Sequence, residues 1–338
     1  LSLERTLSAL VFSTFSIFPQ SGLSYLQADM GLAGEGETAL PALLQAMQGQ
    51  RREDTVPGLY RPQVGRVGPV HFVPNLDICP LPRADWLDTS RSLRRNFWMP
   101  YQTRRGCPLD CSYCSTGSIE GRRIRKRSIS QVIANLQDLQ AAGVSQFFFV
   151  DNTFNLPRSY AEDLCQSIIR AGLHITWCAI VYPMYIDSGL IELMARSGCA
   201  QVSLGFESGN LSMLSELNKR FSPAEVQRIS RLLADQGIRR MGFLLLGAPG
   251  ETRETVEESL AFAQSLELEA LKITVGIRIY PGSRLARQAV QAGVVDPEDS
   301  LLHPRFYLEP GLKKWLPERV KAWSSRRNDL VFAFSKRS

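Results

Sequence analysis

Three cysteines stand close together in the sequence Cys107-Pro108-Leu109-Asp110-Cys111-Ser112-Tyr113-Cys114. Thiolates bind soft metal ions, and these spacings allow one short loop to direct all three at a single metal centre. Structural zinc sites and ordinary iron–sulfur clusters use four protein ligands, yet no further Cys or His occurs before Cys165. The motif therefore predicts a catalytic centre in which one coordination position stays open.

The sequence around this motif alternates short apolar runs with helical patterns. The expected strands are Trp98–Thr103, Gln146–Val150, Ile175–Ile180, Gln201–Gly205, Met241–Leu246 and Leu271–Ile279. The expected helices are Ile129–Ala142, Arg158–Ala171, Ser188–Ser197, Pro223–Gln236 and Arg253–Leu266. Six successive β/α units predict an α/β fold in which a parallel sheet curves into a partial (β/α)6 barrel. The cysteine motif follows the first strand, so we expect it at the C-terminal edge of the sheet, where barrel enzymes carry their active sites.

The segments that flank the barrel have different patterns. In residues 1–75, an apolar strand-like run, Ala9–Phe18, precedes a helix expected over Thr38–Gln48. This is one tail-end βα unit of an α/β domain, too small to fold alone, and we expect that the sequence begins inside a longer protein. Residues 76–95 are expected to form a linker, 96–285 the barrel and 286–338 a C-terminal extension.

Composition indicates an ordered protein that works in a reducing environment. The 338 residues are 44% hydrophobic, which suits one large domain and a smaller one. The seven cysteines lack a disulfide-like spacing, and no secretory signal is evident, which predicts free thiols and a cytoplasmic location. The net charge of +6 lies entirely within residues 313–338, so a protein-wide nucleic-acid surface is not expected.

The basic C-terminal segment also carries apolar residues at helical spacing. These residues are Leu316, Val320, Trp323, Leu330, Val331 and Phe334, with Lys and Arg between them. The pattern predicts a basic amphipathic helix. Two roles stay open for it: packing across the barrel, or peripheral contact with an anionic membrane surface or an acidic partner. The membrane role would assist access to a lipid-like substrate.

The motif CxxxCxYC, formed by Cys107, Cys111, Tyr113 and Cys114, resembles that of the radical S-adenosylmethionine (SAM) superfamily. The resemblance implies that the three thiolates hold a [4Fe–4S] cluster and that SAM binds the open iron. It further implies that an electron donor of the flavodoxin or ferredoxin type drives cleavage of SAM to a 5′-deoxyadenosyl radical. Tyr113 corresponds to the aromatic residue that packs near the adenine of SAM.

The same resemblance implies cofactor-binding residues at two strand ends. Asp151 and Asn155 follow the second strand, where the family contacts the methionine end of SAM, although this segment departs from the commoner Gly-Gly-Glu pattern. Ser203 and Glu207 alternate on one face of the fourth strand, which in the family reaches the ribose or methionine of SAM. The alternative for Asp151 and Glu207 is helix capping or an ion pair at the barrel rim.

The end of the fifth strand carries a second recognisable turn. Its sequence, Gly247-Ala248-Pro249-Gly250-Glu251-Thr252, resembles the Gly-x-Pro-Gly-Glu-Thr turn of methylthiotransferase and cobalamin-dependent branches. The resemblance implies that Gly247 and Glu251 contact the cofactor. Glu251 and Thr252 also suit the start of a helix, so a capping role stays open.

The sixth strand supplies the catalytic candidates Arg278 and Tyr280. Alternation with period two places both on one face, opposite Ile277 and Ile279. An Arg that points into a barrel mouth needs an anion, such as the SAM carboxylate or an acidic group of the substrate. A structural ion pair is the alternative.

The N-terminal residues narrow the resemblance to one branch. Residues 29–37 and the helix after them resemble the last unit of the cobalamin-binding domain that precedes many radical SAM barrels. This branch implies a methyltransferase that acts on an unactivated carbon of a small-molecule or lipid-like substrate. No Asp-x-His-x-x-Gly motif for an axial cobalamin ligand is visible, so the expected cobalamin site is incomplete in this sequence.

Other functions and other signals stay open beside this interpretation. The enzyme alternatives are a methylthiotransferase and a cobalamin-independent radical SAM enzyme for rearrangement or cyclisation, and the non-enzyme alternative is a structural metal-binding interaction protein. The basic run at residues 122–127 could meet a phosphate or the SAM carboxylate, or form a solvated face. The dispersed Cys79, Cys165, Cys178 and Cys199 are expected to be buried hydrophobes, with a catalytic role for Cys178 as the alternative.

Overall fold

A computed structural model describes residues 10–11, 17–69, 71–86, 97–325, 327 and 330–333, which form two compact units. The first unit combines Leu1–Cys79, Gly106–Arg125 and Arg278–Arg305. The second combines Pro80–Arg105, Lys126–Ile277 and Phe306–Ser338. The cysteine loop therefore belongs to the same unit as the N-terminal segment.

The second unit is built on a seven-stranded parallel sheet in the order β15-β12-β11-β10-β9-β8-β5. Its strands are β5 (Met99–Tyr101), β8 (Gln146–Phe149), β9 (Thr176–Val181), β10 (Cys199–Glu207), β11 (Arg239–Leu246), β12 (Ala270–Val275) and β15 (Leu330–Ala333). Successive strands lie side by side and the sheet stays open, with β5 and β15 at its edges. Five of the six predicted strands and the first part of the sixth, Ala270–Val275, are confirmed with their parallel pairing. β15 is an additional strand that the sequence pattern did not predict.

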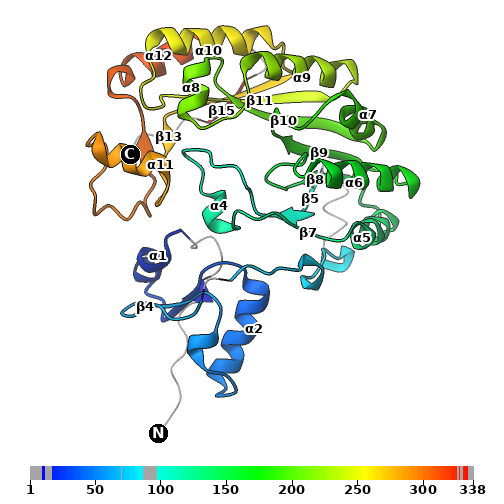
Figure 1. The fold of residues 1–338 in the computed structure, drawn as a ribbon, viewed down its shortest axis with the longest axis vertical. Coiled ribbons are helices and arrows are strands. Elements are labelled where there is room, and N and C mark those ends of the chain that lie inside the picture. The colour runs from blue at the N-terminus through cyan, green and yellow to red at the C-terminus, as the bar shows by residue number, and fades with distance from the viewer. Residues whose placement is uncertain are drawn as a thin grey trace. The chain divides into compact units, whose positions relative to one another are not determined.

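Helices connect these strands and cover the outer face of the sheet (Figure 1). They are α5 (Ile129–Ala141), α6 (Arg158–Arg170), α7 (Ser188–Arg196), α8 (Leu211–Glu216), α9 (Pro223–Asp235), α10 (Arg253–Ser265) and α12 (Trp315–Ser324). The five predicted crossover helices are confirmed to within one residue at each end. Side chains cap the starts of α7, α9 and α10, but not those of α5 and α6. Ser222, for example, accepts a hydrogen bond from the Glu225 backbone N–H and forms a capping box with that residue.

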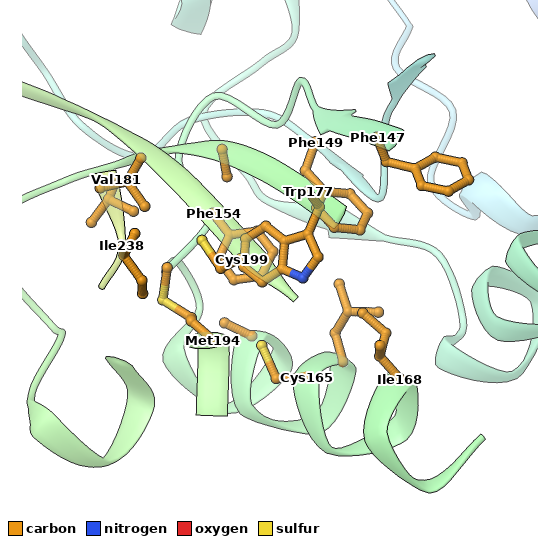
Figure 2. Close-up of a cluster of buried hydrophobic side chains, with 14 of the residues drawn as sticks. Phe147, Phe149, Phe154, Cys165, Ile168, Trp177, Val181, Met194, Cys199 and Ile238 are labelled. Carbon is orange, nitrogen blue, oxygen red and sulfur yellow. The ribbon is translucent and has the colours of Figure 1, made fainter. Parts of the chain in front are cut away.

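Burial alternates along the strands because every second side chain points toward the helices. In β9, Trp177, Ala179 and Val181 are buried, whereas Cys178 and Ile180 between them are half-buried. Figure 2 shows the helix-facing layer, in which the rings of Phe149, Phe154 and Trp177 lie close to side chains from α6 and α7. The half-buried face of the sheet is the one that carries no helices and remains available for ligands.

The first unit contains a four-stranded sheet in the order β1-β2-β3-β4. Its elements are β1 (Leu10–Val11), α1 (Pro19–Leu26), β2 (Met30–Leu32), α2 (Gly36–Met47), β3 (Leu59–Arg61), β4 (Gly65–Arg66), α4 (Thr116–Ile119) and α11 (Arg284–Gln291). The parallel pair β1–β2 and the helix α2 match the predicted βα unit. The predicted strand Ala9–Phe18 is confirmed only at Leu10–Val11, since residues 9 and 12–16 lie outside the described part and Phe18 caps α1.

Short elements occur in the connecting segments. They are the strands β6 (Arg104–Arg105), β7 (Arg125–Lys126), β13 (Ile277–Arg278) and β14 (Phe306–Tyr307), and one-turn 3-10 helices at Glu53–Thr55, Leu76–Ile78, Ala84–Trp86 and Pro310–Leu312. The predicted sixth strand is divided, because Gly276 has a positive φ of 80° and separates β12 from β13.

The C-terminal segment departs from its predicted form. The expected amphipathic helix is limited to α12, which ends at Ser324, and Leu330–Ala333 forms the strand β15 instead. Helical spacing alone was misleading here, because pairing with β12 decides the conformation of this stretch. Leu316 and Val320 on α12 are fully buried, which favours the packing role over a membrane-facing role. Among the described residues, no helix is long and apolar enough to cross a membrane.

Candidate functional site

The cysteine loop is closed at its base by backbone and side-chain hydrogen bonds. The Gly106 N–H donates to Glu120 Oε2 at 2.9 Å, and the Cys107 N–H donates to the Gly121 carbonyl at 3.0 Å. Gly106 has a φ of +91°, and a Cβ at this position would lie 2.2 Å from the Arg123 carbonyl oxygen. Only glycine fits where the loop begins.

The three cysteines of this loop form no disulfide in the structure and differ in exposure. Cys107 is buried, Cys111 half-buried and Cys114 exposed. The Sγ of Cys114 lies 3.2 Å from Thr116 Oγ1 and accepts a hydrogen bond from the Thr116 N–H. Across the described ranges, no three His, Cys, Asp or Glu side chains converge as a preformed metal site. The donor chemistry of three thiols fits an iron–sulfur cluster.

Arg278 and Tyr280 belong to the same unit as the cysteine loop. The Arg278 guanidinium carbon lies 5.0 Å from the centre of the Tyr280 ring, so the two side chains share one side as the alternation predicted. The Arg278 Nε is buried and has no hydrogen-bond partner in the described part of the chain. No ion pair to Arg278 is found there either, so the structural ion-pair alternative gains no support.

The helix α11 contacts the cysteine loop directly. The Leu285 N–H, in the first turn of α11, donates to the Ser112 carbonyl at 2.9 Å, next to Tyr113, which is half-buried. A concavity of about 490 Å³ lies along this helix. Its lining is mostly apolar and includes Ala286, Val290, Val295 and Leu301, with Arg287 and Asp299 among the polar residues.

The basic run after the loop is only partly solvated. Arg122, Arg123 and Lys126 are exposed, but Arg125 and Arg127 are buried. Arg125 forms an ion pair with Glu35 in the first unit, and Arg127 donates to the Pro80 carbonyl in the second. The solvated-face interpretation is therefore wrong for these two residues.

At the end of β8, Asp151 is fully buried and occupied by hydrogen bonds. Its two oxygens accept from the Thr103 N–H at 2.7 Å, the Thr103 Oγ1 at 2.5 Å, the Arg104 N–H at 3.0 Å and the Arg104 Nε at 3.0 Å. These four bonds use the lone-pair capacity of a carboxylate. Asp151 thus fixes the chain just before the cysteine loop, through Arg104, a residue that the sequence interpretation did not single out.

Asn155 is also buried and hydrogen-bonded within the protein. Its Nδ2 donates to the carbonyls of Tyr182 and Met184, and its Oδ1 accepts from the Tyr182 N–H at 3.0 Å. The side chain therefore holds the loop after β9 to the loop after β8. Both amide hydrogens of Asn155 are therefore used within the protein, and its Oδ1 accepts one of the two bonds that it can accept.

The end of β10 is irregular where Ser203 and Glu207 were expected to share a face. A β-bulge shifts the register between Gly205 and Glu207, so alternation from Ser203 does not carry through. Glu207 has a φ of +62°, which is uncommon for a residue with a side chain and typical of functional positions. Its Oε1 lies 3.3 Å from Lys219 Nζ, and a Cβ on Gly205 would come within 2.9 Å of the same oxygen.

The turn after β11 folds Glu251 back onto its own backbone. The Glu251 Oε2 accepts hydrogen bonds from the N–H groups of Gly247 and Ala248, whereas Oε1 is buried without a hydrogen-bond partner among the described residues. Burial raises the pKa of Glu251 to about 7, although the two backbone donors oppose this shift. Thr252, not Glu251, caps α10. Glu251 is thus a buried carboxyl group in the turn after β11, and its charge changes near neutral pH.

Of the remaining cysteines, Cys79, Cys165 and Cys199 are buried as expected, and Cys178 is half-buried. Desolvation raises the pKa of Cys165 to about 12 and that of Cys178 to about 11, and the pKa of Cys199 is raised for the same reason. A thiol that stays protonated at neutral pH is a poor nucleophile and metal ligand. These values favour the packing role of Cys178 over a catalytic role.

The chain is similar to known proteins across most of its length. A sequence profile described as the Radical SAM superfamily matches residues 101–263. An uncharacterised methyltransferase of Pyrococcus horikoshii is 30% identical over 269 residues, which cover 78% of this chain and 58% of that protein. The cytidylyl-2-hydroxyethylphosphonate methyltransferase of Streptomyces wedmorensis is 26% identical, covering 84% and 61%. The chain spans about 60% of the length of these curated relatives.

Solved structures share the fold. TsrM, a radical SAM methyltransferase from Kitasatospora setae with tryptophan and a SAM analogue bound, has a TM-score of 0.83 at 21% identity, covering 97% of this chain and 73% of that chain. OxsB, a cobalamin-dependent SAM radical enzyme with aqua-cobalamin and SAM bound, has a TM-score of 0.76 at 15% identity, covering 93% and 53%. These likenesses confirm the predicted α/β partial-barrel fold. Residues 101–263 of this chain are a domain of the radical SAM superfamily.

Proposed function

We propose that this chain is the cluster-binding and SAM-binding part of a cobalamin-dependent radical SAM methyltransferase. The observation that carries the proposal is the closed loop of Cys107, Cys111 and Cys114 within a radical SAM domain. Curated relatives named as methyltransferases support the reaction type. Their substrates differ, from a cytidylyl phosphonate to tryptophan, so we assign the substrate only as a small molecule with an unactivated carbon.

The radical SAM domain implies a [4Fe–4S] cluster and SAM, and this chain offers groups for both. The three loop cysteines would hold the cluster, which supplies the electron for reductive cleavage of SAM when bound. Gly106 and the hydrogen bonds at the loop base keep the cysteines on one closed segment. Arg278, whose Nε lacks a partner among the described residues, would bind a carboxylate of SAM or substrate, with Tyr280 against its guanidinium.

The strand ends of the second unit would contribute in two ways. Ser203, Glu207, Gly247 and Glu251 lie at or near the C-terminal ends of β10 and β11 and remain proposed contacts for SAM. All four lone-pair positions of Asp151 and both amide hydrogens of Asn155 are used by protein partners, so we propose that these residues position the neighbouring loops instead.

The cobalamin part of the proposal rests on the relatives rather than on ligands in this chain. Residues 1–79 contain a single His, His71, and the sequence has no Asp-x-His-x-x-Gly motif. These residues do not fit cobalamin binding through that axial-His motif. We therefore propose cobalamin binding for the whole protein and assign none of its ligands, His71 included, to these residues.

The electron donor and the cytoplasmic location stay predictions. We propose a small electron-transfer protein of the flavodoxin or ferredoxin type, because reductive SAM cleavage consumes one electron. Contact of residues 313–338 with a membrane or an acidic partner is disfavoured by the buried Leu316 and Val320. A lipid-like substrate consequently gains no support from this segment.

Anaerobic reconstitution tests the proposal. The full-length protein is loaded with iron and sulfide, reduced with dithionite, and mixed with SAM in the presence or absence of hydroxocobalamin. We expect a SAM-dependent change in the cluster EPR signal, 5′-deoxyadenosine, and S-adenosylhomocysteine that requires cobalamin. Absence of both the EPR change and 5′-deoxyadenosine would refute the radical SAM activity. Formation of 5′-deoxyadenosine with no cobalamin-dependent S-adenosylhomocysteine would refute the methyltransferase and favour rearrangement or cyclisation.

A further inference from the structure

The loop exit holds a buried ion pair that no part of the proposed chemistry uses. Arg125 Nη1 lies 2.7 Å from Glu35 Oε1 and 2.6 Å from Glu35 Oε2, and these side chains are only 6% and 7% exposed. Glu35 directly precedes α2, yet its side chain makes no capping hydrogen bond to that helix. Its carboxylate accepts a bond from the Val73 N–H at 2.5 Å instead. Glu35 is thus committed to Arg125 and to the segment at Val73.

The other contacts of Arg125 connect the same segments. Nη1 also donates to the Val73 carbonyl at 2.8 Å, and Nη2 donates to the Glu120 carbonyl at 2.6 Å. The guanidinium carbon lies 5.3 Å from the centre of the Phe72 ring. One guanidinium therefore joins residues 35, 72–73 and 120, which are distant in sequence and belong to one unit.

A short path of contacts leads from this pair to the first cysteine. Glu120, whose carbonyl accepts from Arg125, uses its own carboxylate to accept from the Gly106 N–H. The next residue, Gly121, accepts from the Cys107 N–H, and a Cβ on Gly121 would press on the Phe72 ring at 3.2 Å. The two residues that close the cysteine loop are thus the two residues held by Arg125 and Phe72.

We propose that Glu35 and Arg125 are positioning residues that fix the cysteine loop to the N-terminal segment and set the orientation of Cys107. The proposal rests on the proposed function in that Cys107 is taken as a cluster ligand. The observation behind the proposal is that Arg125 binds the carbonyl of Glu120, whose carboxylate in turn accepts from the Gly106 N–H at the base of the loop. Buried ion pairs add little net stability compared with apolar residues, whereas removal of one partner leaves an unpaired charge.

Hydrogen exchange and EPR on the full chain test this role. Glu35→Gln keeps the side-chain shape and removes the charge, and Arg125→Lys keeps the charge and removes the fork that contacts Glu35, Val73 and Glu120 together. For both variants we expect amide exchange at Gly106 and Cys107 to rise by about tenfold and the cluster EPR signal to change its shape. The matched control is Arg52→Gln, which breaks the exposed Arg52–Asp54 pair of the same unit and should change neither readout.

Each outcome decides the proposal. Faster exchange at Val73 alone, with unchanged exchange at Gly106 and Cys107 and an unchanged EPR signal, would show a merely structural pair and overturn it. If Glu35→Gln does not fold, Arg125→Lys is read by the same criteria. Hydrogen exchange needs no cluster, SAM or methyl acceptor. Failure of the wild-type protein to transfer methyl groups would therefore sink the proposed function while the exchange result still decides the role of the pair.

Discussion

One buried arginine, Arg104, precedes the cysteine loop and another, Arg125, follows it. The carboxylates that pair with these two arginines make different further contacts. Arg104 pairs with Asp151, which also accepts hydrogen bonds from the backbone N–H groups of Thr103 and Arg104. Arg125, after the loop, pairs with Glu35, which accepts one backbone N–H besides. Asp151 lies inside the matched radical SAM region at residues 101–263, and Glu35 lies outside it. The segment before the loop is therefore held by a residue of the radical SAM domain, and the segment after it by a residue of the N-terminal segment.

The largest expected effect comes from the loop between the two arginines. In Cys111→Ser, we expect iron content and SAM cleavage to fall to background, because two thiolates cannot hold the cluster in place of three. Both arginine networks should survive, so the thermal midpoint of the cluster-free protein should match that of cluster-free wild type. Cys79→Ser is the matched control and should keep its iron. Retained SAM cleavage in Cys111→Ser would contradict the assigned ligand set.

The two carboxylates should differ in their effect on stability. We expect Asp151→Ala to lower the free energy of unfolding by about 4–5 kcal/mol, since it leaves a buried arginine unpaired and removes the acceptor of three further donors. Glu35→Ala should cost about 3 kcal/mol, because it orphans one backbone N–H besides Arg125. Urea unfolding of cluster-free protein measures both values. An equal or larger loss for Glu35→Ala would reverse the comparison.

Glu251 is a buried carboxyl group that forms no ion pair with an arginine among the described residues, and it should make stability depend on pH. Its pKa in the folded state is raised from 4.5 to about 7, so the folded protein keeps a proton that the unfolded chain has released in this window. The free energy of unfolding should therefore fall by up to about 3 kcal/mol as pH rises from about 4.5 to 7. Glu251→Gln should remove that slope, whereas Glu254→Gln, an exposed neighbour, should preserve it. Identical pH profiles for wild type and Glu251→Gln would show that Glu251 does not titrate there.

The smallest effect is expected from a half-buried pair of the same chemistry. Arg319 contacts Glu257 through two hydrogen bonds, but the side chains are 30% and 44% exposed. Arg319→Gln should cost less than about 1 kcal/mol, and salt should weaken the effect, because water screens the charges. A loss as large as that for Glu35→Ala would mean that burial does not explain the difference between the pairs. Urea unfolding at low and high salt measures it.

The barrel and the cysteine loop could be predicted from the sequence because both are encoded locally. Apolar runs such as Gln146–Phe149 and the spacing of Cys107, Cys111 and Cys114 show their roles within a few residues. The ion-pair partners of the buried arginines could not be predicted, because the paired residues lie far apart in the sequence. Nothing next to Arg104 or Glu35 reveals that each meets a partner 47 or 90 residues away. Asp151 was expected at a strand end, but only the structure shows that its oxygens are occupied.

The last strand has a practical consequence for handling this protein. β15 covers one edge of the sheet by pairing with β12 over Leu271–Thr274. A chain shortened before residue 330 would leave the N–H and C=O groups on that edge of β12 open to strands of other molecules. Trimming the basic tail to improve solubility would therefore invite edge-to-edge aggregation. A safer truncation keeps Leu330–Ala333 and removes only the residues after Ala333.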